Sequence, residues 1–194
     1  MQLVAQVLVL LSFIKLSAAV FRTTCPVFTH AYMDPIVAPG ARSGHEHSIA
    51  GSLGFSDQIS AAQMLAAQTT CSISEDKSAY WFPSLYRTDT GARMIPIAQA
   101  YYMNEHPPVN EINVLTTNIN MIVGTSLGGA AASLDNINFL VREAGVNDGR
   151  PQDSGRFGFK MNGNRVYEVR IDYLFPSCWN GGPYTASQSH MAYP

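Results

Sequence analysis

Two histidines one residue apart, His45 and His47, follow a segment rich in proline and glycine. In an extended chain, side chains alternate between two faces, so both imidazoles would project from one face while Glu46 points away. Neutral imidazoles bind divalent metal ions and exchange protons near neutral pH, and Asp34 lies upstream to supply a carboxylate. The pattern predicts a metal site or an acid–base pair. The alternative is a turn in which the histidines only bind backbone groups.

Polar and aromatic residues gather in two further segments, one in the middle of the chain and one near its C-terminal end. Aromatic rings beside acids, amides and imidazoles are the composition of a sugar-binding cleft, because pyranose faces are apolar and their rims carry hydroxyls. Core packing and solvated charges are the alternative. With the imidazole pair, the candidate residues are Asp34, His45, His47, Lys77, Tyr80, Trp81, Arg87, Trp179, Asn180 and His190. His30 and His106 are expected to be structural.

Two kinds of chemistry suit this set. A metal centre of His45, His47 and His190 would hold one divalent ion and leave a coordination position open. Without a metal, proton abstraction from an acidic sugar needs a base and a group that neutralises the carboxylate. Lys77, Tyr80 and His190 could supply the base, and Arg87 the positive charge. Both schemes require the N-terminal imidazoles and His190 to share one pocket.

A third pattern belongs to another class of enzyme. Residues 124–128, Gly-Thr-Ser-Leu-Gly, match the G-x-S-x-G elbow that carries the nucleophile of α/β-hydrolases. Ser126, Asp172 and His190 then follow in the order Ser, Asp, His. A parallel sheet would also need recurring strand–helix alternation, which the sequence lacks. A small cutinase-like serine esterase is therefore an alternative.

The overall composition suits one domain with its own core. The chain has 194 residues, is 46% hydrophobic and only 13% charged, and carries a net charge of −2. No basic stripe is present, so no nucleic-acid partner is expected.

The first residues form an apolar run that ends in Ser17-Ala18-Ala19. Small residues at these positions fit cleavage after Ala19, so residues 1–19 are predicted to be a signal peptide and residues 20–194 a secreted domain. A membrane anchor is the alternative, but Lys15 interrupts a run too short to span a bilayer. No membrane span is expected after cleavage. In an oxidising compartment one disulfide should form, and Cys25, Cys71 and Cys178 leave three pairings open.

The secondary structure that must position these residues is predicted to be mostly strands. Strands are expected over 21–28, 80–86, 95–103, 118–123 and 169–175, an ordered loop over 35–54 and a surface loop over 145–164. Ser56 could cap a helix that ends near residue 68 and turns Ile59, Ala62, Leu65 and Ala66 inward. The prediction is a single mainly β domain, an antiparallel sandwich with one short helix and long ordered loops.

Four blocks of the sequence resemble a known family. They are DPIVAPGARSGHEHSIAG (34–51), CSISEDKSAYWFPSLY (71–86), the strand at 95–103 and FPSCWNGGPYTASQSHMAYP (175–194). The chain resembles the secreted fungal domain of unknown function 1996 (DUF1996) family. It departs from the family in carrying Tyr32 in place of an arginine and Asn180 in place of an aspartate, and in ending soon after the HMAYP motif, as a truncated member would.

The resemblance implies a secreted fungal protein associated with the cell wall, but no reaction. Together with the candidate residues, it predicts a protein that engages cell-wall or extracellular polysaccharide in a cleft of histidines and aromatic rings. The sequence leaves open whether the protein cuts the glycan or only binds it. The serine esterase is one alternative, and a structural wall protein without a ligand is the other.

Overall fold

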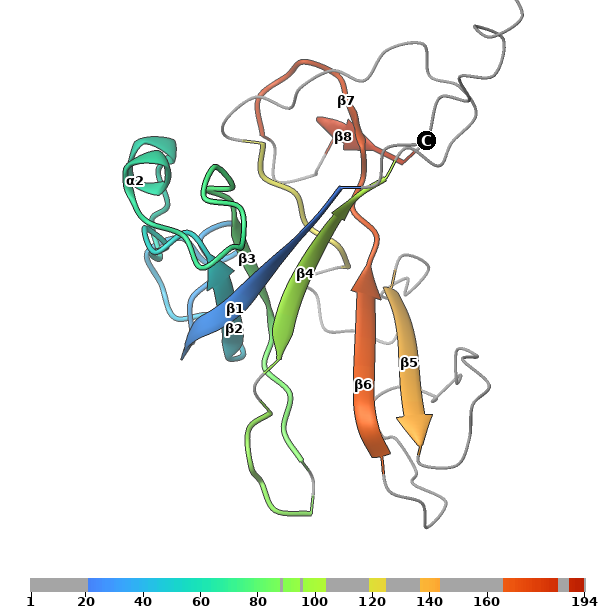
Figure 1. Ribbon diagram of the computed structural model, residues 1–194. Coiled ribbons are helices and arrows are strands. Elements are labelled where there is room, and N and C mark those ends of the chain that lie inside the picture. The colour runs from blue at the N-terminus through green and yellow to red at the C-terminus, as the bar shows by residue number, and fades with distance from the viewer. Residues whose placement is uncertain are drawn as a thin grey trace, which may run out of the picture. The chain divides into compact units, whose positions relative to one another are not determined.

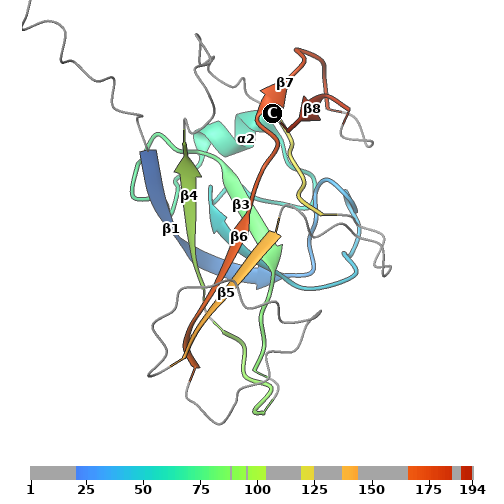
Figure 2. The ribbon, with the colours of Figure 1, turned by 90° about the vertical axis from the view of Figure 1, so that its right-hand side faces the viewer.

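The computed structural model describes residues 21–87, 89–94, 96–103, 119–124, 137–143, 166–184 and 189–193. The chain forms two compact units, residues 1–114 and 115–194, and each is described by itself. Strands dominate the described residues, and α2 (Ala61–Ala66) is the one helix among them (Figures 1 and 2). The predicted mainly β fold, with antiparallel strands and one short helix, is confirmed. Packing as a sandwich stays a prediction. No helix in the described part is long and apolar enough to cross a membrane.

The first unit is built on a four-stranded antiparallel sheet of order β3-β2-β1-β4. Its strands are β1 (Phe21–Ala31), β2 (His47–Gly51), β3 (Ala79–Pro83) and β4 (Ile97–Tyr102). The long strand β1 joins two pairs, because its first half pairs with β4 and its second half with β2. Figure 1 shows β1 running beside β4.

Strand β1 continues beyond the predicted end at residue 28, through a proline. Pro26 is the last residue that pairs with β4, and pairing with β2 begins at Val27. Proline lacks an N–H group, so it is tolerated where the strand changes partner. Its carbonyl still accepts a hydrogen bond of 2.8 Å from Thr70 Oγ1.

A disulfide between Cys25 and Cys71 belongs to the buried core of this unit. Both cysteines are buried with Ala50, and Val27, Tyr80 and Ala98 pack around them. The bond ties β1 to the segment before β3, across 46 residues of sequence. The structure thus forms one of the three pairings that the sequence leaves open. Cys178 is a free, exposed thiol.

Two local predictions in this unit were wrong. The expected loop over 35–54 contains β2, a strand that is buried along its whole length. Helix α2 is capped by Ser60 rather than Ser56, and it runs for 6 residues. Met64 is its buried residue, whereas Leu65, expected to face inward, is 55% exposed. The cap follows the Ser-x-x-Gln spacing of a capping box, since Ser60 Oγ accepts a hydrogen bond from the backbone N–H of Gln63.

Two pairs of antiparallel strands occur among the described residues of the second unit. They join β5 (Ile137–Glu143) to β6 (Val166–Tyr173), and β7 (Cys178–Trp179) to β8 (Met191–Ala192). The strand predicted over 169–175 overlaps β6. The strand predicted over 118–123 does not form at residues 119–123, where the carbonyl of Asn120 binds a side chain instead of a neighbouring strand. The predicted surface loop at 145–164 lies outside the described residues.

Candidate functional site

The register of β2 and β3 places the candidate residues of the first unit on two faces of the sheet. His47 pairs with Pro83, and Trp81 lies two residues before Pro83. Antiparallel partners share a face, and side chains alternate along a strand, so His47 and Trp81 share one face, here called the imidazole face. Tyr80 has the other parity and belongs to the opposite face.

The two histidines at the start of β2 lie against each other. The ring centroids of His45 and His47 are 4.4 Å apart and the rings are inclined by 55°. His45 precedes the strand in a bend and is exposed, whereas His47 is only 4% exposed. Ser43 fixes the bend, because its hydroxyl donates a 2.5 Å hydrogen bond to the carbonyl of His45. The pair therefore combines one reachable imidazole with one enclosed imidazole.

Asp34 approaches the enclosed ring from the preceding loop. One of its carboxylate oxygens, Oδ1, accepts hydrogen bonds of 3.0 Å from the backbone N–H groups of Ile36 and Val37. The other oxygen, Oδ2, lies 4.0 Å from Nε2 of His47. The base of the loop is closed by a 3.1 Å hydrogen bond from the N–H of Ser43 to the carbonyl of Tyr32. The loop thus holds the carboxylate in place beside His47.

Burial keeps His47 neutral. Desolvation lowers the pKa of its imidazole, and the neighbouring His45 lowers it further, against the opposing effects of Asp34 and the backbone of Met33. Its Nδ1 atom is buried and has no hydrogen-bond partner within the described part of the chain. An unpaired buried polar atom costs free energy, so the enclosure of this nitrogen destabilises the fold locally.

Tyr80, a candidate base, lies in a different environment on the opposite face. Its hydroxyl donates to Asp76 at 2.9 Å and lies 3.0 Å from the hydroxyl of Tyr102. Burial, followed by the hydrogen bond with Tyr102, raises the pKa of Tyr80. A phenol that resists ionisation is a poor base, so this environment favours hydrogen bonding over proton abstraction.

The remaining candidates of the first unit differ in their surroundings. Trp81 packs against Phe55 with ring centroids 5.4 Å apart. Arg87 is exposed and its guanidinium donates a 3.0 Å hydrogen bond to the carboxylate of Asp89, the main cause of its raised pKa. Lys77 is half-buried in the segment before β3. These contacts do not bring Arg87 to the imidazole pair.

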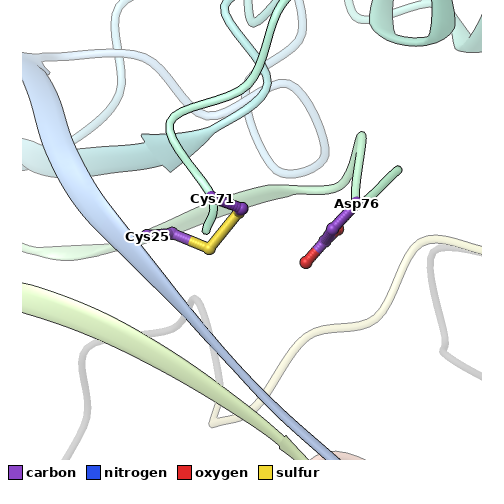
Figure 3. Close-up of side chains that lie close together, drawn as sticks. All are labelled: Cys25, Cys71 and Asp76. Atoms are coloured by element: carbon purple, nitrogen blue, oxygen red, sulfur yellow. A yellow bond between two sulfur atoms is a disulfide. The ribbon is translucent and has the colours of Figure 1, made fainter. Parts of the chain in front are cut away.

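One group of three potential metal ligands occurs among the described residues, and it is not the predicted one. Cys25, Cys71 and Asp76 bring ligand atoms within 4.8 Å of one another (Figure 3). The two sulfur atoms form the disulfide, whereas metal binding requires thiolates. The group is therefore a disulfide crosslink next to a carboxylate, and its sulfur atoms are not available as metal ligands.

The candidates of the second unit come together through the pairing of β7 with β8. Trp179 pairs with Met191, and the N–H of Asn180 donates a 3.0 Å hydrogen bond to the carbonyl of His190. The amide of Asn180 also donates to the carbonyl of Ser189 at 3.1 Å. A carboxylate could not make this bond, so the amide at position 180 has a structural role here.

His190 is 2% exposed. Its Nε2 lies 2.8 Å from the carbonyl oxygen of Asn120, which can only accept, so Nε2 carries a proton. The ring of Tyr184 meets the imidazole edge-on, with centroids 5.4 Å apart. Nδ1 is buried without a hydrogen-bond partner in the described ranges. The metal set of His45, His47 and His190, and the shared pocket that it requires, stay predictions.

The esterase pattern also stays a prediction. Ser126 lies outside the described residues. Of its proposed partners, Asp172 accepts a 2.6 Å hydrogen bond from Nε of Arg170, and His190 donates to Asn120 as described above.

Residues 34–194 match the family model described as domain of unknown function (DUF1996). The chain belongs to the DUF1996 family. No curated protein and no solved structure matches it. The matched DUF1996 region contains all ten candidate residues, and the family description names no reaction.

Sequence reasoning missed a polar cluster of this DUF1996 protein. His30, Ser48 and Ser84 meet on the face opposite the imidazoles, next to Glu46, Tyr86 and Arg93. The outward direction of Glu46 was predicted from alternation. The other members come from separate segments with no common motif, so only the strand register brings them together.

Proposed function

We propose that this DUF1996 protein is a secreted, wall-associated fungal protein that binds polysaccharide through its imidazole face. The observation that carries the proposal is the arrangement of His45, His47 and Asp34 on the face that also carries Trp81. Binding, rather than cleavage, is proposed because Tyr80 is held as a hydrogen-bonded phenol on the opposite face.

The chemistry of these groups suits a sugar. Imidazole nitrogens and a carboxylate oxygen form hydrogen bonds with hydroxyl groups, and an indole ring packs against the apolar face of a pyranose. His45 is exposed and can reach a ligand, while the enclosed ring of His47 packs against it. The proline-rich loop fixes Asp34 in advance, which reduces the entropy lost on binding.

Two features support secretion. The apolar leader ends in residues suited to signal-peptidase cleavage, and the mature part contains the Cys25–Cys71 disulfide. Disulfides persist in oxidising, extracellular environments.

The proposal is tested by measuring the binding of the secreted protein to a panel of purified polysaccharides. The panel includes β-glucan, chitin, mannan and uronic-acid polymers, and calorimetry gives the affinity for each. The wild-type protein should bind at least one of them. Replacement of His45 by Ala should weaken that binding about tenfold, as the loss of one hydrogen bond predicts.

A matched control is Ser74→Ala, which removes an exposed hydroxyl bonded to the neighbouring Glu75. This variant should bind as the wild type does. The proposal fails if the folded wild-type protein binds nothing in the panel, or if both variants bind equally well. Release of unsaturated sugar ends during incubation would show cleavage in addition to binding.

A further inference from the structure

Three side chains with exchangeable protons meet on the sheet face opposite the imidazoles. Ser48 Oγ lies 3.1 Å from His30 Nδ1, and Ser84 Oγ lies 3.3 Å from the same nitrogen. The two hydroxyl oxygens are 3.1 Å apart. His30 and Ser48 are paired residues of β1 and β2, and Ser84 extends the pairing of β3 by donating its N–H to the carbonyl of Glu46. Three neighbouring strands therefore build the cluster.

The number of protons in the cluster depends on the tautomer of His30. Each hydroxyl supplies one proton, and a ring nitrogen either donates or accepts but never does both. When Nδ1 of His30 is the acceptor, the two hydroxyl protons can serve only two of the three contacts. In that tautomer the proton of Ser84 has more than one acceptor available.

Glu46 provides a further acceptor for Ser84. Its carboxylate accepts hydrogen bonds from Tyr86 at 2.5 Å and from Nη2 of Arg93 at 2.8 Å. The hydrogen bond from Tyr86 is the main cause of the lowered pKa of Glu46, and the side chain of Ser84 contributes in the same direction. The hydroxyl of Ser84 thus lies between an imidazole and an ionised carboxylate.

A general base at Nδ1 must be a neutral imidazole whose proton is on Nε2. Desolvation lowers the pKa of His30, and the positive charge of Arg93 lowers it further, against the effect of Glu46. His30 is therefore neutral at neutral pH. His30 and Ser84 are half-buried, whereas Ser48 is fully buried. Of the two serines, Ser84 is therefore the one that is partly exposed.

We propose that Ser84 is a nucleophile with His30 as its general base, in a site that hydrolyses carboxylic esters. Ser84 Oγ forms a bond to the acyl carbon while its proton moves to Nδ1 of His30. The ester C–O bond then breaks, and the departing alkoxide takes that proton. Water attacks the acyl-enzyme, gives a proton to His30, and releases the carboxylic acid as Ser84 regains its proton. Arg93 supplies positive charge in the same cluster. The proposal is independent of glycan binding at the imidazole face.

The test uses a fluorophosphonate probe, which forms a covalent adduct with nucleophilic serines. The secreted protein with its disulfide intact is incubated with the probe, digested, and analysed by peptide mass spectrometry. An adduct is expected on Ser84. The Ser84→Ala variant should carry no adduct in that peptide, and His30→Gln should label at least tenfold more slowly, as expected for loss of a general base.

Ser48→Ala is the matched control, because it removes the buried hydroxyl but leaves both His30 and Ser84. It should still be labelled on Ser84. The proposal is overturned if the folded wild-type protein shows no adduct on Ser84 at saturating probe, or if His30→Gln is labelled as fast as the wild type. An adduct on Ser126 without one on Ser84 would also overturn it. Glycan binding by the same preparation reports separately on the proposed function.

Discussion

His47 illustrates how a single enclosed residue links the proposed site to stability. Its folded-state pKa lies below the ordinary value of 6.5, mainly because burial disfavours the charged imidazole. Below pH 6.5 the unfolded chain therefore binds more protons at this residue than the folded chain does. The contribution of His47 to the free energy of unfolding therefore falls as the pH drops from about 7 to about 5.

This pH dependence can be tested by removing the imidazole of His47. Replacing His47 by Gln, a neutral side chain, should make the free energy of unfolding less dependent on pH between about 5 and 7. Urea denaturation of both proteins at several pH values measures the two slopes. His30 also has a lowered pKa, so the variant should retain part of the slope. Equal slopes for variant and wild type would contradict the burial argument.

For single residues, the sequence predicts those side-chain positions that depend only on neighbouring residues along the chain. The proximity of the rings of His45 and His47 and the outward direction of Glu46 follow from alternation over three residues. The contacts of His30 with Ser48 and Ser84 follow instead from the register between strands far apart in the sequence. Side-chain type carries no information about that register, and His30 was therefore expected to be structural.

Strand β2 depends on a glycine at its end. Gly51 has a φ of +88°, and a Cβ atom there would lie 2.2 Å from the carbonyl oxygen of Ser78. Both the left-handed backbone and the close approach of Ser78, the residue before β3, oppose a side chain here. Gly51→Ala should therefore lower the free energy of unfolding by about 3 kcal/mol. Thermal and urea unfolding provide the measurement.

Gly44 is the matched control, because a Cβ atom there would have no neighbour within 4 Å. Gly44→Ala should change the stability by less than about 0.5 kcal/mol. Similar losses for the two variants would mean that the effect comes from glycine itself and not from the contact between β2 and β3.

The disulfide is the second element-scale constraint, since it ties β1 to the segment before β3. Cross-linking residues 46 positions apart restricts the unfolded chain. The chain-entropy relation gives a stabilisation of about 4 kcal/mol for a loop of this length. The double variant Cys25→Ser, Cys71→Ser should lose that amount in urea unfolding. Cys178→Ser, which removes the free exposed thiol, should unfold as the wild type does; a comparable loss there would contradict the pairing.

The elements themselves were predictable where the pattern was long enough. Aromatic and β-branched residues predicted the strands that became β3, β4 and β6, because these side chains favour an extended backbone. Helix α2 was predicted with the wrong N-cap and the wrong inward-facing residues. A helix of 6 residues is too short for the spacing of its apolar residues to show which face is buried. The predicted end of β1 at residue 28 was too early, because the change of partner strand cannot be seen in the local sequence.

At the scale of the whole molecule, composition and four sequence blocks predicted a mainly β protein and its family. Both are confirmed, since strands dominate the described residues and the DUF1996 model matches residues 34–194. The predicted convergence of His45, His47 and His190 is a different kind of prediction. It depends on which segments distant in the sequence meet in the fold. The spacing of residues along this chain contains no repeat or motif from which that contact could be predicted.

Secretion is the last prediction, and it concerns the fate of the entire chain. Signal peptidase requires small side chains at the last and third-last positions of a leader, which here are Ala19 and Ser17. Expression in a secreting host should release a protein whose intact mass, measured by mass spectrometry, corresponds to a chain that begins at Val20. Ala19→Trp places a bulky side chain at the cleavage position and should leave the leader attached. Substitution of Lys15 by Ala keeps the cleavage position intact, so this control should still be cut after Ala19. Wild-type protein that stays inside the cell with its leader attached would contradict secretion and remove the oxidising environment that the Cys25–Cys71 bond requires.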